Sequence, residues 1–266
     1  MPDELDVTFA WGIADGVAGF GVGASGTEAD ATRYRWTVPE DVFSFSVALW
    51  PGYIGHAGPH PGVIAPVVLY NVPTEPGELW LLEPGYPERY SFSVGAVVGA
   101  SFAGGAGGGG GPIVYGFAGA SATVLSKRTG GGDLVVAVLG GEGGMAQGTN
   151  PDVWASSPGP TTTGDPVAAP GSGSAGSAGA LRGGGGGGGW PGGDGAPDEE
   201  LAGFSGGNYL PPSTDLGGER SPTLAEAEID TPVAPTTGDP VRFGALSAWW
   251  YADDPTGWII GAVGFG

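Results

Sequence analysis

The chain has 266 residues, among them 58 glycines and 25 prolines, and its 8 basic and 28 acidic side chains give a formal net charge of −20. Glycine does not recur at every third position, which excludes a collagen triple helix, and so many helix-breaking residues exclude an ordinary helical protein. Yet 40% of the residues are hydrophobic, including nine Trp and ten Phe, so the chain has the apolar surface that disordered sequences lack. We expect a folded, mainly β protein with very little helix.

The acidic charge and the absence of cysteine restrict partners and location. Phosphate backbones and anionic membrane surfaces repel such a chain, so we expect no nucleic-acid binding. No run of about 18 apolar residues is present, so we expect no membrane insertion. Zero cysteines exclude disulfides and thiolate sites, which favours synthesis in a reducing cytoplasm. The first residues, Met1 to Asp6, are acidic where a signal peptide needs positive charge, so we expect no export by that route.

The first hundred residues show strand patterns separated by proline and glycine. The clearest alternation places Phe43, Phe45, Val47 and Leu49 on one face of a strand with small residues between them, which predicts a half-buried strand. A glycine-dense turn region is expected up to Gly26. The predicted strands of this part are Val7–Trp11, Arg33–Val38, Val42–Trp50, Val63–Leu69, Glu78–Leu82 and Tyr90–Val98.

The middle of the chain is of low complexity, and the end returns to strand patterns. We predict a β-sandwich or jelly-roll-like framework from residues 1–100, a glycine- and proline-rich insertion over 101–240, and framework-completing strands over 241–266. The segment Thr162–Val167 recurs as Thr236–Val241, which is typical of a shared turn type more than of a duplication. The further apolar segments are Ile113–Phe117, Ala122–Leu125, Asp133–Leu139, Val241–Phe243, Leu246–Tyr251 and Gly257–Val263.

Two glycine runs, Gly104–Gly111 and Gly183–Gly189, allow two interpretations. A run can be a flexible linker. It can also form an extended helix with three residues per turn, whose backbone groups are free to bond to neighbouring segments. Large aromatic residues flank both runs, as caps would flank a thin packed layer, so we favour packing. The flanking residues are Phe102, Tyr115, Phe117 and Trp190.

Two glycine motifs resemble catalytic or cofactor fingerprints in letters alone. Gly21–Gly26 matches the dinucleotide-binding spacing, but no helix or βαβ unit follows it, so we predict a loop. Gly203–Gly207 matches the nucleophile elbow, but both histidines lie upstream of it, so we predict a turn.

Candidate metal and acid–base residues are equally unconvincing. His56 and His60 are four residues apart, but the glycines and prolines around them exclude the helix that would give this spacing a meaning. Gly192–Pro197 approaches a calcium-binding repeat without recurring, Asp253–Asp254 fits a turn, and Glu199–Glu200 would need a cleft to act as a catalytic pair. We therefore expect no enzyme, no cofactor and no metal site, and we name no catalytic or binding residue.

Three aromatic groups could present flat rings to a glycan or to a protein partner. They are Trp50–Tyr53, Trp249–Tyr251 and Gly207–Tyr209. Burial of these rings in the core or in a subunit interface is the commoner outcome for aromatic residues.

Taken together, the pattern resembles a family of glycine-rich minor tail proteins of tailed bacteriophages, particularly those that infect actinobacteria. The resemblance covers residues 33 to 195. It is carried by Trp36–Val42, which leads into the strand Phe43–Leu49, by the turn and strand Glu75–Leu82, and by glycine blocks separated by Asp133–Gly141.

The resemblance implies a structural virion component of the tail tip or of a fibre, made in the host cytoplasm. It also implies contributions to host attachment, contacts with other tail proteins and with a host cell-surface glycan, and a homotrimer. Alternatives are a secreted glycine-rich cell-envelope protein or adhesin, and a carbohydrate-active enzyme.

Overall fold

The computed structural model describes a subset of the chain. The described residues are 3–7, 11–13, 17–23, 32–51, 53–54, 67–86, 101–105, 108, 116, 118–144, 161–163, 183–197, 201, 203–210, 241–242 and 245–251. They contain strands and extended segments but no helix, and hence no helix of the length and apolarity that a membrane crossing needs. The mainly β fold is confirmed.

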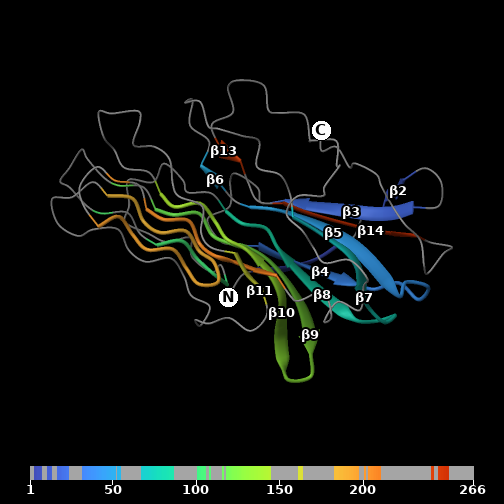
Figure 1. Ribbon diagram of the computed structural model, residues 1–266. Helices are drawn as coiled ribbons and strands as arrows, with labels where there is room; N and C mark the ends of the chain where they lie inside the picture. Colours follow the sequence, from blue (N-terminus) through green and yellow to red (C-terminus); the bar gives the residue numbers. More distant parts are fainter. Residues whose placement is uncertain are drawn as a thin grey trace.

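Most strands form two sheets (Figure 1). The seven-stranded sheet has the order β1-β4-β8-β9-β10-β12-β11, and the five-stranded sheet has the order β2-β3-β14-β5-β7. The strands of the larger sheet are β1 (Asp3–Asp6), β4 (Thr32–Thr37), β8 (Leu79–Glu83), β9 (Thr123–Thr129), β10 (Gly132–Leu139), β11 (Thr161–Thr163) and β12 (Asn208–Leu210). Those of the smaller sheet are β2 (Trp11–Ile13), β3 (Val17–Gly23), β5 (Ser44–Trp50), β7 (Val67–Pro73) and β14 (Ala245–Tyr251), and a separate pair joins β6 (Tyr53–Ile54) to β13 (Val241–Arg242).

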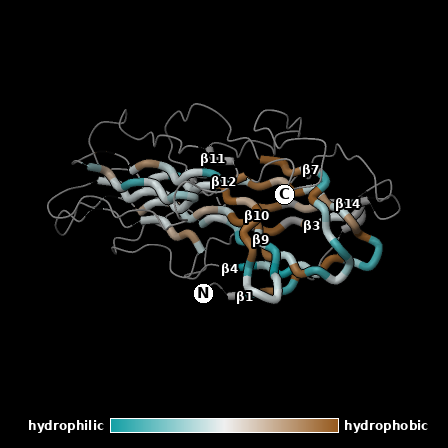
Figure 2. The backbone as a smooth tube through the Cα atoms, turned by 60° about the horizontal axis from the view of Figure 1, so that its bottom comes forward, coloured by the Kyte–Doolittle hydropathy of each residue, from teal (hydrophilic) through white to brown (hydrophobic). Residues whose placement is uncertain are grey.

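The two sheets pack face to face as a sandwich around an aromatic core. Trp36 of β4 stacks on Trp250 of β14 with ring centroids 5.0 Å apart, so the two rings join the two sheets. Phe45 meets the edges of both Trp36 and Trp80, at 5.0 and 4.9 Å. Offset and edge-to-face aromatic contacts add to the free energy of burial. Figure 2 shows hydrophobic residues concentrated in the strands of this part of the molecule.

Strand β5 departs from the half-buried pattern predicted for it. All residues from Phe45 to Leu49 are buried, because β5 lies between β14 and β7 inside the smaller sheet and both of its faces are covered. Phe43, predicted to share the buried face with Phe45, lies just before the strand and is 53% exposed.

The predicted turn region before Gly26 is wrong for residues 17–23, which form β3. Phe20 and Val22 are buried there and alternate with glycines. Glycine lowers strand propensity, so the local sequence favours a turn, whereas pairing with β14 over the whole length of β3 imposes a strand. Gly21–Gly23 of the dinucleotide-like motif are therefore strand residues.

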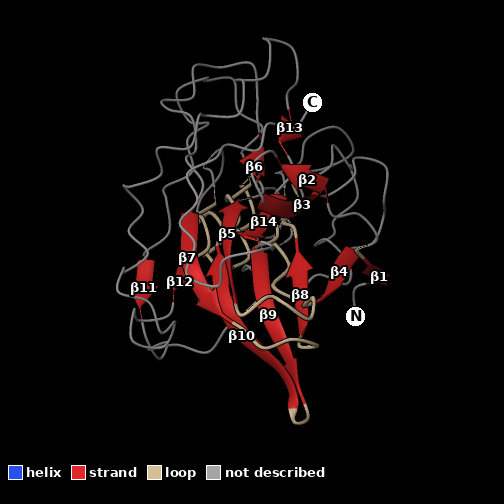
Figure 3. Ribbon diagram, turned by 90° about the vertical axis from the view of Figure 1, so that its right-hand side faces the viewer, coloured by secondary structure: helices blue, strands red, loops and turns tan. Residues whose placement is uncertain are grey.

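Strand β14 shows how distant segments complete the smaller sheet. It lies between β3 and β5 and pairs antiparallel with both. Strands β9 and β10, which come from the glycine-rich middle of the chain, lie inside the larger sheet and form a hairpin that projects from the body (Figure 3). The predicted strands Tyr90–Val98 and Gly257–Val263 lie outside the described residues.

Candidate functional site: the glycine bundle and the charged sheet face

The larger sheet continues at one end into a bundle of extended, glycine-rich segments, which we call the glycine bundle. It comprises residues 102–108, 116–122, 140–144, 183–196 and 201–207, as far as they are described. Figure 1 shows these segments running side by side next to the sandwich. At the junction, Asn208 of β12 accepts a hydrogen bond from the Gly140 amide at 2.7 Å. At the adjoining end of the sheet, Thr123 of β9 accepts one from the Gly85 amide at 2.9 Å.

The run Gly183–Gly189 lies in the centre of the glycine bundle, and all seven residues are buried. Its backbone hydrogen bonds recur at every third residue. Gly184, Gly187 and Trp190 donate to the carbonyls of Leu201, Phe204 and Gly207, respectively, at 2.9 Å each. Such a repeat is typical of polyproline-II-like helices, which have three residues per turn and no internal hydrogen bonds.

Other sides of the same run accept hydrogen bonds from further segments. Its carbonyls accept from Gly105 and Gly108, from Gly141 and Gly144, and from Gly193 and Ala196. The central run therefore bonds to neighbours in several directions, unlike a strand, which bonds only to its two sides. The packed interpretation of this run is confirmed, as is that of Gly104, Gly105 and Gly108 in the first run, which are also buried.

Close packing of backbones explains why these positions are glycine. A Cβ atom on Gly184 would overlap the carbonyl oxygen of Gly144, and one on Gly186 would overlap that of Gly193. Because the obstructing atoms belong to hydrogen-bonded backbone, they cannot rotate away as a side chain would.

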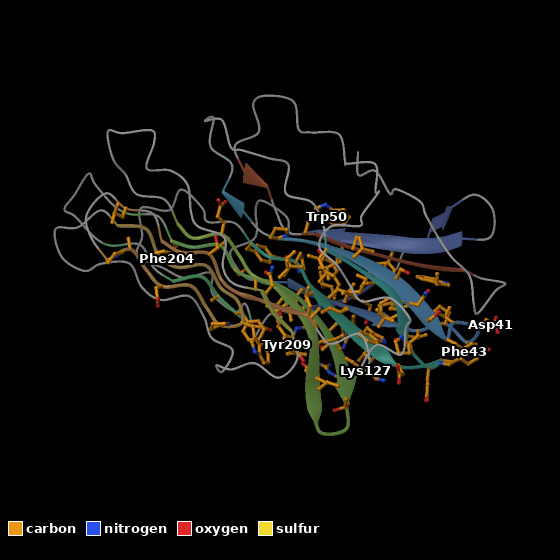
Figure 4. The ribbon with its side chains drawn as sticks, viewed as in Figure 1. Asp41, Phe43, Trp50, Lys127, Phe204 and Tyr209 are labelled. Carbon is orange, nitrogen blue, oxygen red and sulfur yellow. The ribbon has the colours of Figure 1, made fainter. Side chains whose placement is uncertain are left out.

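Gly203–Gly207, predicted as a turn, is one of the extended segments of the glycine bundle. Gly203 donates to Gly144 at 2.8 Å and Gly206 to Gly141 at 2.9 Å. The segment therefore runs antiparallel to residues 141–144. Phe204 points away from the backbone layer and is 45% exposed (Figure 4).

Aromatic rings close the glycine bundle where it meets the sheet. Trp190 stacks on Tyr209 at 4.9 Å and meets Phe102 edge-on at 5.7 Å. These three rings pack with Val124 and Val138 on the outer face of the larger sheet. The expected capping role of Phe102 and Trp190 agrees with this cluster, while Tyr115 and Phe117 lie outside the described residues.

The outer face of the larger sheet also carries a network of ion pairs, which we call the arginine network. Its members are Glu4, Asp6, Arg33, Arg35, Glu83, Arg128 and Asp133. Arg128 on β9 reaches Glu4 on β1 at 2.6 Å and Asp133 on β10 at 2.9 Å. Arg33 on β4 reaches Asp133 at 2.8 Å. The network thus spans strands from one edge of the sheet to its middle.

The most buried acid of the arginine network is fully satisfied. Glu83 is 2% exposed and accepts hydrogen bonds from Arg33 at 3.3 Å and from the amide and hydroxyl of Ser101 at 2.6 Å each. These hydrogen bonds offset the cost of burying a carboxyl group. This arrangement also joins the start of the glycine bundle to the end of β8.

Arginine contacts set the ionisation of the exposed acids. Hydrogen bonds from Arg128 hold the pKa of Glu4 and the pKa of Asp133 below their ordinary values, and this effect outweighs partial burial. The same two carboxylates raise the pKa of Arg128. Glu4 and Asp133 are therefore held in the ionised form as ion-pair partners of Arg128.

A second ion pair fixes a turn at the end of the sandwich. Lys127 binds Glu78, which also accepts from Thr74 at 2.8 Å, and Thr74 accepts from the Trp80 indole at 2.9 Å. Burial opposes ionisation of Glu78, but the hydrogen bonds from Lys127 and Thr74 outweigh it and lower the pKa. Beyond this turn, Asp41 and Phe43 are exposed at the far end from the glycine bundle (Figure 4).

The structure places one residue of each predicted aromatic group. Trp250 is a core residue, Trp50 is partly buried, and Tyr209 belongs to the aromatic cluster. Asp194 of the calcium-like segment is exposed in the glycine bundle, and the described residues include no group of three His, Cys, Asp or Glu side chains that could hold a metal. The other motif residues lie outside the described part: His56, His60, Glu199, Glu200, Asp253 and Asp254.

The arginine network was not anticipated from sequence. The available signal is the alternation of Arg33 and Arg35 on one strand and of Glu4 and Asp6 in the acidic segment, which places each pair on one face. Nothing local indicates that the two segments pair in parallel.

In comparisons with known proteins, no family model and no curated protein sequence matches this chain.

Proposed function

We propose that this protein is a non-enzymatic structural component of a phage tail tip or fibre and contributes to attachment to the host cell. The observation that carries the proposal is the buried, cross-bonded run Gly183–Gly189. A layer made of hydrogen-bonded backbone is a stiff element with few side chains, suited to holding other segments in place more than to forming a catalytic cleft.

The topology supports a role in display. Gly116, which begins one described segment, donates a hydrogen bond to Gly108, which ends another, at 2.8 Å. Gly144, which ends the described segment 140–144, donates to Gly185, close to the start of the central run at Gly183. Several ends of described segments therefore lie together on the glycine bundle, and ordered scaffolds of this kind commonly present binding residues.

The proposed class, a phage tail protein, rests on the resemblance of the glycine-rich sequence. The thin core of the glycine bundle supports assembly of identical subunits. Glycine segments bury little side-chain area, so contacts between copies would add the apolar burial that they lack. We propose a homotrimer that also contacts other tail proteins, with a host-surface glycan as the receptor.

Two experiments test the proposal. Mass spectrometry of purified virions from a phage that encodes this chain should find it in the particle, and antibody labelling should place it at the tail. Purified protein should bind host cells and compete with phage adsorption. Its absence from virions would overturn the proposal. Release of reducing sugar from host-wall polysaccharide by purified protein would favour the carbohydrate-active alternative.

A further inference from the structure

Strand β1 is held to the protein almost entirely by polar contacts. It forms one edge of the larger sheet and pairs in parallel with β4 over four residues. Its single apolar side chain, Leu5, is 49% exposed, and Asp6 is exposed. Only the next residue, Val7, packs against the core. Edge elements with so little apolar burial belong to the least stable parts of a fold.

The edge that receives β1 is basic. Arg33 and Arg35 project from β4 toward Glu4 and Asp6, and Arg128 reaches the same Glu4 from β9. The groups that face these arginines from the neighbouring elements are Glu83 on β8, Asp133 on β10 and Ser101. An acidic extended segment with carboxylates at alternate positions therefore fits this edge in both charge and register.

We infer that β1 exchanges between copies: the acidic strand of one copy occupies the arginine-lined edge of β4 in a second copy. The inference does not depend on the proposed function. The exchanged strand makes the same hydrogen bonds and ion pairs as it makes within its own chain. The main free-energy cost is therefore the translational and rotational entropy lost when two copies associate. That cost falls as the effective concentration of copies rises.

Charge and connectivity favour a second copy as the partner. Three of the eight basic residues, Arg33, Arg35 and Arg128, pair with the carboxylates of β1. The β1 strand of a second copy carries the same carboxylates at the same spacing, so it fits a vacated edge as well as the chain's own strand does. Three residues separate Val7 from β2 in the other sheet, and short connections of this kind favour exchange of the element that they join.

Cysteine cross-linking tests the exchange cleanly because the chain has no cysteine of its own. Asp3 and Thr32 are register partners of β1 and β4. Full-length Asp3→Cys and Thr32→Cys proteins are prepared separately, mixed, and oxidised mildly. Non-reducing electrophoresis and mass spectrometry then compare mixed cross-links with cross-links between identical variants. The double variant in one chain, diluted before oxidation, reports the pairing within a copy.

We expect mixed cross-links, which join position 3 of one copy to position 32 of another, in several-fold excess over both kinds of identical pair. Adding Glu4→Gln and Asp6→Asn to the Asp3→Cys protein should abolish the excess. The matched control, Glu40→Gln with Asp41→Asn in the exposed turn, changes the charge equally and should keep it. No excess, together with an intrachain disulfide in the double variant, would show that β1 stays with its own chain and would overturn the inference. Failure of both cross-links would overturn it as well, because the β1–β4 pairing would then be absent.

Discussion

In the sandwich, side chains fill the space between two sheets, whereas in the glycine bundle the backbone itself fills the space. Trp36, Phe45 and Trp250 meet in the sandwich at about the spacing that aromatic rings prefer. In the glycine bundle, Gly184 and Gly186 sit against carbonyl oxygens of neighbouring segments. In Figure 4, many side chains lie within the sandwich and few lie within the glycine bundle.

This difference predicts opposite responses to substitution. The sandwich is stabilised by apolar area, so it is sensitive to removal of atoms. The glycine bundle is stabilised by satisfied backbone groups at close approach, so it is sensitive to addition of atoms. The following substitutions are ordered from the largest expected effect to the smallest.

Trp36→Ala should lower the free energy of unfolding the most, by about 3–5 kcal/mol, because it leaves a cavity between the two sheets. Chemical denaturation followed by tryptophan fluorescence measures this loss. Phe43→Ala is the matched control, because Phe43 is 53% exposed and exposed positions change stability by about 0.5 kcal/mol or less. Equal losses for the two variants would contradict the assignment of the core.

Gly186→Ala should destabilise the glycine bundle by about 2–3 kcal/mol, because the added methyl overlaps the backbone of Gly193. Hydrogen exchange of residues 183–189 measures the effect directly, and those amides should be protected in the unmodified protein. Gly130→Ala in the β9–β10 turn is the control, since nothing lies within 4 Å of its added Cβ. Unprotected amides in the unmodified protein would show that the run is a flexible linker and not a packed segment.

Gly77→Ala should cost about 1 kcal/mol for a different reason, because Gly77 has a φ of +81° and open space around it. Asparagine tolerates this backbone conformation better than alanine, so Gly77→Asn should recover part of the loss. Gly186→Asn should recover nothing, because space and not φ limits that position. Thermal unfolding of the four variants separates the two uses of glycine, and a rescue at position 186 would contradict the packing argument.

Acid should weaken the arginine network by the smallest amount, less than about 1 kcal/mol, because its outer members are partly exposed and screened. The pKa values of Glu4 and Asp133 lie below their ordinary values of 4.5 and 3.8 in the folded protein. Their stabilisation is therefore complete above about pH 4.5 and is lost as the pH falls through the depressed values. The free energy of unfolding should differ less between pH 6 and pH 3 in Arg128→Gln than in the unmodified protein. An equal difference in both proteins would show that the arginine network is not its source.

Much of the fold follows from local sequence. The strand pattern of Arg33–Val38 and the alternation of Phe43–Leu49 predict β4 and β5, and the apolar segment Asp133–Leu139 coincides with β10. The flanking aromatics of Gly183–Gly189 favour a packed run over a linker. Residues 17–23 show the limit of this reasoning, because their glycines favour a turn until β14 supplies a partner strand.

The sequence by itself determined that this protein is a mainly β, glycine-dependent structure with a strongly acidic charge, since composition and period-two patterns are local properties. Tertiary structure alone decided that Glu4 meets Arg128, that Trp190 stacks on Tyr209, and which segments surround Gly183–Gly189. The physical reason is that these contacts join residues far apart in the chain. A glycine run has no side chains whose pattern could specify its neighbours, so only the assembled backbone does.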